Sequence, residues 1–223
     1  MTTEVKICGI KTKAVLDAAL DAGADYVGLV LHPASARDVD FELAEQLADR
    51  ARGRAQVVAL VVNPGPALLS VVAADVRADI LQLHGDETPD DVAYARAWMK
   101  ECGGRAGANC KIWKAIAVAE AADLKKVSAY AGLVDRILFD AKPPPDPGAL
   151  PGGNGLSFDW RILDGHKDKS FVLAGGLRPE NVADAIRLVK PAVVDVSSGV
   201  ETSPGEKSPE LIRRFIRAAK GGK

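Results

Sequence analysis

Reactive side chains close two of the short apolar runs in this 223-residue sequence. Cys8 ends the run EVKIC (4–8), and Asp140 ends the run DRILFD (135–140). A thiolate can remove a proton and a carboxylic acid can supply one, so these two groups suit acid–base catalysis. A free cysteine is more commonly a small buried hydrophobic residue, whereas an aspartate is costly to bury without a partner. Asp140 is therefore the stronger candidate of the two.

Other polar residues lie at or just past the ends of similar runs, namely Arg37, Gln82, His84, Lys114, Asp195 and Ser197. Arg37 could equally be an ordinary arginine of a surface loop, and Lys114 could be a structural ion-pair partner. Side chains alternate along a strand, so Lys6 and Cys8 share one face. Because a thiolate is favoured by nearby positive charge, Lys6 is a candidate source of that charge.

These residues need a fold that brings distant strand ends together. Short β-branched runs alternate with amphipathic stretches along the whole chain, and the runs are apolar at nearly every position, as in a buried parallel sheet. Eight strand–helix units can close a barrel, so we predict a single α/β domain over residues 1–223, a (β/α)8 TIM barrel. An open doubly wound sheet is the alternative, but its Gly-x-Gly-x-x-Gly signature is absent. Functional residues of such barrels lie at the C-terminal ends of the strands.

The predicted strands span residues 4–8, 26–31, 56–62, 79–83, 111–116, 135–140, 170–175 and 192–197. The predicted helices include 13–23, 41–51, 89–99, 119–131, 179–189 and 209–219. Helix starts are expected at Pro64, Thr88, Pro179 and Ser208, and after an N-cap at Asp40. The segment ECGGRAGANC (101–110) is predicted to be a loop, and the long irregular segment 141–157 a functional loop.

Two glycine-containing loops carry the pattern of an anion site. They read AGGLRPEN (174–181) and SSGVETSPGEK (197–207), and they follow strands seven and eight, where such barrels frequently bind phosphate. Glycine lets backbone N–H groups approach a ligand closely, and hydroxyl groups add donors. Two ordinary turns are the alternative. The predicted phosphate-binding residues are Gly175, Gly176, Ser197, Ser198 and Gly199.

Composition narrows the possible partners. The 29 basic and 30 acidic residues give a formal net charge of -1, which does not support nucleic-acid or membrane binding. Three cysteines, an odd and sparse set, and no recognisable secretory leader favour a reducing compartment, so the cytoplasm is expected. No stretch is long and apolar enough for a transmembrane helix. The three histidines share no metal-ligand spacing, so neither a metal nor a cofactor is expected.

Seven segments together make the chain similar to the phosphoribosylanthranilate isomerase family along nearly its whole length. They are VKICGIK, GADYVGLVLHPASAR, LQLHGDE, ILFDAK, GGNGLSFDW, LAGGLRPENV and VDVSSGVETSPGEK. All seven occur in the family's order and at the same barrel positions. The resemblance implies a cofactor-free Amadori rearrangement in tryptophan biosynthesis, which converts N-(5-phosphoribosyl)anthranilate to 1-(2-carboxyphenylamino)-1-deoxyribulose 5-phosphate.

The resemblance also implies roles for the candidate residues. Asp140 would protonate the furanose oxygen as general acid, Cys8 would remove the C2 proton as general base, and Arg37 would hold the anthranilate carboxylate with its fork of donors. A thiolate base needs a lowered pKa, which we predict for Cys8 in the substrate complex. We also expect Asp195 to bind sugar hydroxyl groups and Gln82 or His84 to line the pocket. A lid loop over the substrate is expected from Gly152, Gly153, Asn154 and Gly155.

Two other classes of function stay open. Another phosphate-binding barrel enzyme is one, although the indole-glycerol-phosphate synthases would be expected to use a lysine and a glutamate, and the histidine-pathway isomerase paired aspartates. A non-catalytic barrel that binds a phosphorylated metabolite is the other, and it would not need both Cys8 and Asp140. Their joint presence favours the enzyme, with a small-molecule substrate and a monomer or homodimer as its assembly.

Overall fold

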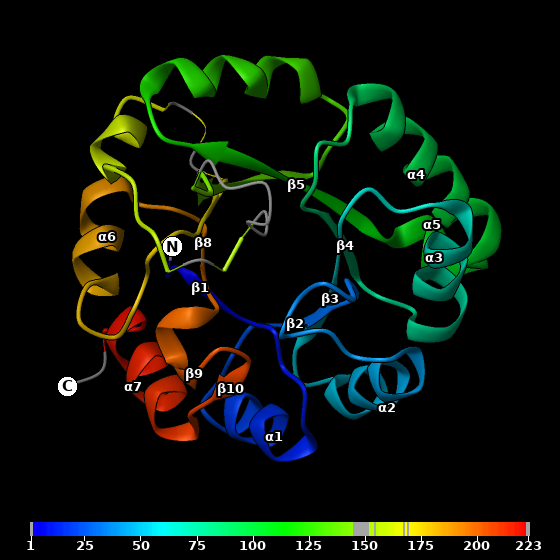
Figure 1. Cartoon of the computed structure of the whole chain (residues 1–223), viewed down its shortest axis with the longest axis horizontal. Helices are drawn as coiled ribbons and strands as arrows, with labels where there is room; N and C mark the ends of the chain where they lie inside the picture. The colour runs from blue at the N-terminus through cyan, green and yellow to red at the C-terminus, as the bar shows by residue number, and fades with distance from the viewer. Residues whose placement is uncertain (1, 145–151, 154, 167, 169, 222–223) are drawn as a thin grey trace.

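Eight parallel strands form a closed barrel in the computed structural model of the chain, with helices packed around it (Figure 1). The structure describes residues 2–144, 152–153, 155–166, 168 and 170–221. Each strand pairs with the next one along the chain, and β8 pairs with β1 to close the ring. The predicted (β/α)8 fold is confirmed.

The strands fall close to the predicted ranges. They are β1 (Glu4–Cys8), β2 (Tyr26–Val30), β3 (Gln56–Val61), β4 (Ile80–Leu83), β5 (Lys111–Val118), β6 (Arg136–Ala141), β7 (Val172–Leu173) and β8 (Val193–Val196). The largest difference is β7, which was predicted to span six residues and spans two. Gly175 and Gly176 both have positive φ, so the chain leaves the extended conformation soon after this strand.

The α-helices are α1 (Lys13–Asp21), α2 (Phe41–Ala51), α3 (Pro66–Val71), α4 (Pro89–Cys102), α5 (Gly104–Asn109), α6 (Val182–Val189) and α7 (Pro209–Ala219). Among the described residues there are also a π-helix, η1 (Val72–Val76), and three 3-10 helices, η2 (Ala121–Tyr130), η3 (Trp160–Leu163) and η4 (Ser198–Val200). Asp40, Thr88 and Ser208 accept hydrogen bonds from the first turns of α2, α4 and α7, which confirms these N-caps.

Several helix predictions were wrong. Helix α3 begins at Pro66 and not at Pro64, because Asn63 has a positive φ and the chain turns there before the helix starts. Helix α6 begins at Val182 rather than near Pro179, since the Asn181 side chain accepts from the Arg178 N–H and holds a turn first. The predicted helix 119–131 is the 3-10 helix η2.

The segment 101–110 is helical, not the predicted loop. Helix α4 continues to Cys102, and α5 follows after a break at Gly103. Gly104 has a positive φ, so the glycine pair ends one helix and lets the chain turn into another. Glycine here redirects the helix rather than excluding it.

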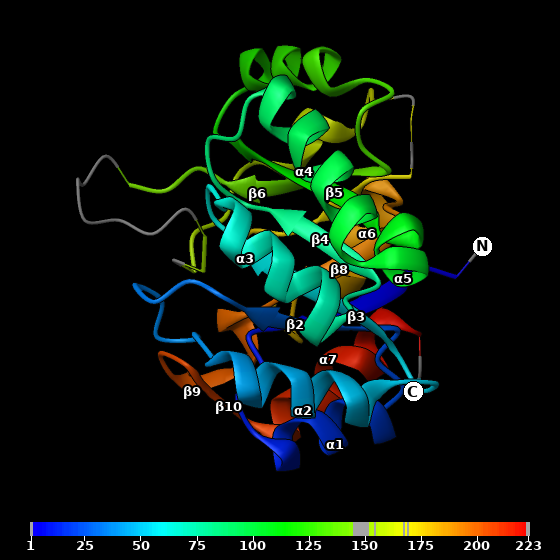
Figure 2. The ribbon, with the colours of Figure 1, turned by 90° about the vertical axis from the view of Figure 1, so that its right-hand side faces the viewer.

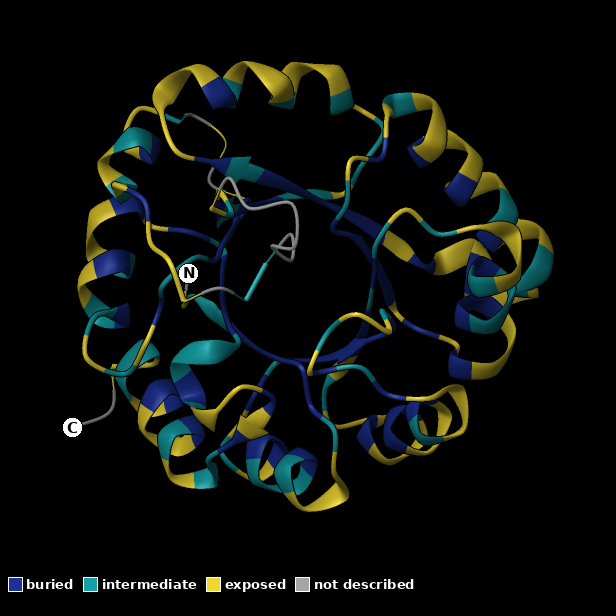
Figure 3. Cartoon of the chain, viewed as in Figure 1, coloured by how far each residue is buried: buried dark blue, intermediate teal, exposed yellow. Residues whose placement is uncertain are grey.

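One apolar cluster lies inside the barrel and a larger one covers its outer face. The outer residues pack under the helices, whose exposed sides face outward (Figure 3). The interior cluster is Tyr26, Val58, Ile80, Trp113, Ala115, Leu138, Val172, Ala174 and Val193. The rings of Tyr26 and Trp113 meet edge to face at 5.1 Å, and Arg136 lies over Trp113. Large side chains therefore fill the barrel and leave its mouth for a ligand.

Three aspartates clamp pairs of strands at the N-terminal end of the barrel. Asp25, Asp79 and Asp135 each stand just before an even-numbered strand and accept from a backbone N–H of the strand before it. The N···O distances are 2.8, 2.7 and 2.8 Å, and the donors are Val5, Val57 and Ile112. These bonds fix strand register at the end that also carries both chain termini (Figure 2).

The opposite end of the barrel carries the loops that follow the strands. The hairpin of β9 (Glu201–Ser203) and β10 (Glu206–Lys207) lies there with the loop after β6 (Figure 2). Among the helices of the described residues, none has the length and apolar character needed to cross a membrane.

Candidate active site

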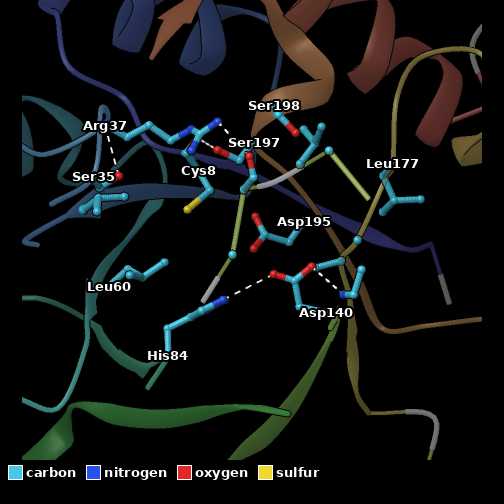
Figure 4. A pocket seen from close by; sticks show the side chains of 18 of the residues that line it. Cys8, Ser35, Arg37, Leu60, His84, Asp140, Leu177, Asp195, Ser197 and Ser198 are labelled. Atoms are coloured by element: carbon cyan, nitrogen blue, oxygen red, sulfur yellow. Dashed lines mark hydrogen bonds and ion pairs between the residues drawn. The ribbon is translucent and has the colours of Figure 1, made fainter. Parts of the chain in front are cut away.

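A cavity opens among the loops at the C-terminal ends of the strands (Figure 4). Cys8 lines it from β1, Asp140 from β6 and Asp195 from β8, while Arg37 and His84 follow β2 and β4. The barrel thus brings together five of the polar residues that the sequence singled out. Cys8 and Asp140, 132 positions apart in the chain, line the same cavity.

Cys8 stands beside a buried ion pair. Lys6, on the same face of β1, is fully buried and donates to Asp195 Oδ2 at 2.9 Å. Burial acts to lower the pKa of Lys6, but Asp195 and then Cys8 raise it, so Lys6 stays an ammonium. Burial raises the pKa of the Cys8 thiol, and the charge of Lys6 opposes that rise. The lowered pKa expected for the substrate complex stays a prediction, because in this structure burial outweighs Lys6.

Gly28 provides the space for this arrangement. It pairs with Cys8 across the β1–β2 ladder. A Cβ at Gly28 would lie 2.9 Å from Cys8 Sγ and 3.2 Å from Lys6 Cε, closer than side chains pack. Because Gly28 has no side chain, the Cys8 thiol and the Lys6 ammonium can lie side by side against β2.

Asp140 is held by a short polar chain. Its Oδ2 atom lies 3.2 Å from His84 Nε2, and its Oδ1 atom accepts from the Ala141 N–H at 2.8 Å. The Gln82 amide lies 2.8 Å from His84 Nδ1. His84 lines the cavity, whereas Gln82 is fully buried behind it and contacts the imidazole. Gln82 was expected to touch substrate; in the structure its described contact is with His84.

Arg37 lies at the cavity in a buried ion cluster that the sequence analysis missed. Its Nε and Nη2 atoms each lie 2.8 Å from a carboxylate oxygen of Glu201, and Lys207 Nζ contacts the same carboxylate. Glu201 and Lys207 stand in SSGVETSPGEK, a segment considered only for its serines and glycine. The sequence feature that could have revealed this cluster is a glutamate and a lysine six residues apart, one on each side of a Pro-Gly turn.

Burial alone would raise the pKa of Glu201, but hydrogen bonds from Arg37 and the charge of Lys207 lower it to about 2. Burial lowers the pKa of Lys207 against the opposing pull of Glu201. Because donors from both Arg37 and Lys207 converge on one carboxylate, we treat all three groups as ionised.

Four of the five predicted phosphate ligands line the cavity, namely Gly175, Gly176, Ser197 and Ser198. Within the described part of the chain, the N–H groups of Gly175 and Gly176 donate to no acceptor. The Ser197 hydroxyl donates to the Cys8 carbonyl and accepts from Lys207, both at 3.2 Å. Gly199 does not line the cavity; a Cβ there would lie 1.9 Å from the Leu177 carbonyl oxygen, so Gly199 serves close packing.

The described glycines of the expected lid loop lie inside the cavity mouth. A Cβ at Gly152 would lie 2.5 Å from His84 Nε2 and 2.8 Å from Asp140 Oδ2. A Cβ at Gly153 would lie 2.3 Å from Arg37 Nη1. Gly155 also lines the cavity, and Asn154 lies outside the described residues. The loop backbone therefore lies close against the Asp140 carboxylate, the His84 imidazole and the Arg37 guanidinium.

Lys114 does not line this cavity. Its Nζ atom lies 3.0 Å from Glu87 Oε2 and donates to the Gly85 carbonyl at 2.7 Å, with both ionic side chains 2% exposed. The structure thus supports the ion-pair alternative for this lysine. Across the residues that the structure describes, no group of three or more His, Cys, Asp or Glu side chains is arranged to hold a metal.

Known proteins of one family resemble the whole chain. The family model described as N-(5'phosphoribosyl)anthranilate (PRA) isomerase matches residues 5–218. The N-(5'-phosphoribosyl)anthranilate isomerase of Afipia carboxidovorans is 49% identical over 221 residues, covering 99% of this chain and 90% of the relative. That of Paramagnetospirillum magneticum is 48% identical over 224 residues and covers both chains completely.

Solved structures agree. Phosphoribosyl anthranilate isomerase from Thermotoga maritima superposes with a TM-score of 0.83 at 34% identity, covering 99% of this chain and 100% of that one. A complex of such an isomerase with reduced 1-(o-carboxyphenylamino)-1-deoxyribulose 5-phosphate gives a TM-score of 0.82 at 32% identity, with the same coverage. The alternatives of a different barrel enzyme and of a non-catalytic binding barrel are not favoured. The chain belongs to the N-(5'-phosphoribosyl)anthranilate isomerase family, and it catalyses the aldose–ketose isomerisation of phosphoribosylanthranilate in tryptophan biosynthesis.

Proposed function

We propose that Asp140 and Cys8 carry out this isomerisation as general acid and general base. Asp140 gives its proton to the furanose ring oxygen while the C1–O bond breaks, which opens the ring to an iminium ion. The Cys8 thiolate then removes the proton at C2, and the electron pair of that C–H bond neutralises the iminium to give an enolamine. Tautomerisation of the enolamine yields the ketone. The observation that carries the proposal is the position of both groups on one cavity.

The electrostatics around Cys8 support its role. The buried Lys6 ammonium opposes the effect of burial on the thiol, and Lys207 acts in the same direction. A thiol has a reference pKa of about 8.5, so a base that works near neutral pH needs such positive charge. Substrate that displaces water from the cavity strengthens the interaction between Lys6 and the thiolate.

Other cavity residues would each bind a different part of the substrate. Arg37 would hold the anthranilate carboxylate, and the open N–H groups of Gly175 and Gly176, with Ser198, would hold the phosphate. Asp195, whose Oδ1 atom has no hydrogen-bond partner in the described part of the chain, would accept from a sugar hydroxyl. The loop around Gly152 and Gly153 must move outward to admit substrate, since its backbone lies against the acid and the guanidinium.

The chain is proposed to act as one domain over its full length, in the cytoplasm, as a monomer or homodimer. The family model spans nearly the whole chain, which supports a single domain. A solved relative is described as mutually generated monomers of the dimeric enzyme from Thermotoga maritima, so both states are compatible with this fold.

Two substitutions test the catalytic roles. Asp140→Asn and Cys8→Ala should each lower kcat by roughly 10²-fold or more, the usual loss when a general acid or base is removed. Cys102→Ser, on α4 and away from the cavity, is the matched control and should leave kcat unchanged. The assay follows the loss of substrate fluorescence with freshly generated phosphoribosylanthranilate. Normal turnover in Asp140→Asn or Cys8→Ala would remove that residue from the mechanism.

A further inference from the structure

The guanidinium of Arg37 is already engaged on its inner edge. Its Nε and Nη2 atoms form two parallel bonds of 2.8 Å to the Glu201 carboxylate, the geometry in which arginine and carboxylate fit best. Nη2 also donates to the Gly153 carbonyl at 3.2 Å. Nη1 has no acceptor among the described residues, and it lies beside Gly153 at the cavity. One nitrogen of the fork is therefore left for a ligand.

Glu201 is itself fixed from the other side. Lys207 Nζ contacts its Oε1 atom, and the Gly205 N–H donates to its Oε2 atom at 3.2 Å. The side chains of Glu201 and Lys207 are 4% and 1% exposed, so water does not compete for these bonds. The β9–β10 hairpin thus holds Glu201 in one position, and Glu201 holds Arg37.

The charges of this cluster do not cancel. Two cations, Arg37 and Lys207, share the single anion Glu201, which leaves one positive charge beside the cavity. A buried cation without a counter-charge is costly, so while Cys8 is an uncharged thiol a ligand that brings one negative charge to this wall is favoured over a neutral ligand of the same shape.

We infer that Glu201 is the positioning residue that makes the site selective for an aromatic amine carrying a carboxylate, by fixing Arg37 so that Nη1 alone meets that carboxylate. The inference rests on the proposed role of Arg37 and extends it. It also changes the expected geometry, because the substrate carboxylate meets the end of the guanidinium and not its bidentate fork.

The test compares two ligands that differ only in the carboxylate. They are the reduced product analogue, reduced 1-(o-carboxyphenylamino)-1-deoxyribulose 5-phosphate, and its phenylamino counterpart, both measured by calorimetry. Glu201→Gln removes the charge that fixes Arg37 and keeps the size of the side chain. It should weaken binding of the carboxylated ligand by about 10- to 100-fold, the range for loss of a hydrogen bond between charged groups. Binding of the phenylamino ligand should change by less than about twofold.

Two further variants make the result specific. Glu206→Gln is the matched control on β10. Glu206 is exposed, and the substitution weakens only its 3.5 Å ion pair with Lys11. It should leave both dissociation constants unchanged. Glu201→Asp keeps the charge with a shorter reach, and it should restore part of the selectivity. If Glu201→Gln fails to fold, Glu201→Asp replaces it in the test. Glu201→Asp should then show a smaller loss of affinity that is still confined to the carboxylated ligand.

Steady-state kinetics with the natural substrate should show the Glu201→Gln defect mainly in KM, because the carboxylate is remote from the reacting atoms. Equal weakening of both ligands, or no weakening of either, would overturn the inference. Arg37→Met separates this from the proposed function. If Arg37→Met loses carboxylate selectivity and Glu201→Gln does not, Arg37 keeps its role and Glu201 has none. If Arg37→Met itself shows no selectivity loss, the role proposed for Arg37 fails.

Discussion

His84 joins Asp140 to the buried amide of Gln82: its Nε2 atom lies 3.2 Å from Asp140 Oδ2, and its Nδ1 atom lies 2.8 Å from Gln82 Nε2. An ionised Asp140 can accept from Nε2–H while Nδ1 accepts from the amide nitrogen. A protonated Asp140 can donate to Nε2 if Nδ1–H faces the amide oxygen, which has no partner in the described residues. His84, backed by Gln82, can therefore keep a hydrogen bond to Asp140 both when its carboxyl group is protonated and when it is ionised.

Replacement of His84 by Ala should lower kcat by about 10- to 100-fold with a smaller change in KM, because the acid loses the partner that orients it. Gln82→Met preserves volume but loses the amide, so it should lower kcat in the same direction and by less. Steady-state kinetics with a melting curve for each variant give the comparison. An unchanged kcat in His84→Ala would show that Asp140 needs no orientation by the imidazole.

Removal of the Lys6 charge should move the pH dependence of catalysis. The folded-state pKa of Cys8 is already raised by burial, and Lys6 limits that rise. In Lys6→Met the thiol should ionise at higher pH, so the rising limb of kcat/KM should shift upward by about one pH unit or more. Lys11→Met replaces a partly exposed lysine outside the cavity; it is the control and should keep the wild-type profile. A profile for Lys6→Met that overlays the wild type would contradict this account of the thiolate.

A methyl group on the lid glycines should disturb the covered state of the cavity. Gly153 has a φ of 76°, and its added Cβ would meet Arg37 Nη1 at 2.3 Å, so Gly153→Ala is strained in two ways. We expect kcat/KM to fall by about tenfold, since closure of a loop both excludes water and completes the site. Gly165→Ala adds a methyl group in open space and should be neutral. Equal kinetics for the two variants would argue against a lid at Gly153.

The stability contributed by Glu201 should be lost in acid. Its folded-state pKa of about 2 is below its ordinary value of 4.5, so the ionised carboxylate stabilises the fold above pH 4.5. As pH falls from 4.5 toward 2, that contribution, on the order of 3 kcal/mol, should disappear. Denaturant unfolding of wild type and Glu201→Gln from pH 7 downward measures the difference between them. A difference that stays constant below pH 4.5 would rule out this linkage.

The aspartate clamps should matter for stability and not for turnover. Asp79→Ala removes the acceptor of the 2.7 Å bond from the Val57 N–H, which should lower the free energy of unfolding by about 1 kcal/mol. Asp79→Asn keeps an acceptor oxygen and should lose less. Urea unfolding gives the stability, and kcat should stay at the wild-type value in both. A large loss of kcat in Asp79→Ala without unfolding would contradict this separation.

The sequence predicted those parts of the molecule that depend on local patterns. Apolar runs located all eight strands, and strand ends located Cys8, Asp140 and Asp195, because a parallel barrel gathers strand ends at one rim. The prediction of a loop at 101–110 was wrong because the segment was judged by its two cysteines, whereas Gly103 and Gly104 let the chain turn from one helix into the next. Pro64 and Pro179 misled the prediction of helix starts because proline at a helix start is also compatible with a turn one or two residues earlier.

The Arg37–Glu201 pair could not be predicted in the same way. The two residues stand 164 positions apart, and neither local composition nor strand alternation relates them. Their contact depends on how the β9–β10 hairpin folds back onto the loop after β2, which only the closed barrel determines. The same holds for Gln82, whose strand position predicted a cavity contact although its side chain reaches His84 instead.

The clamps of Asp25, Asp79 and Asp135 lie at the far end of the barrel from Cys8 and Asp140. None of the three lines the cavity, so the frame and the rim can be altered independently. A protein engineer who wants this scaffold to accept a different aminated sugar would leave the three aspartates in place. Diversity would go into the hairpin that carries Glu201 and into the loop after β2, which carries Arg37, the residue proposed to bind the substrate carboxylate.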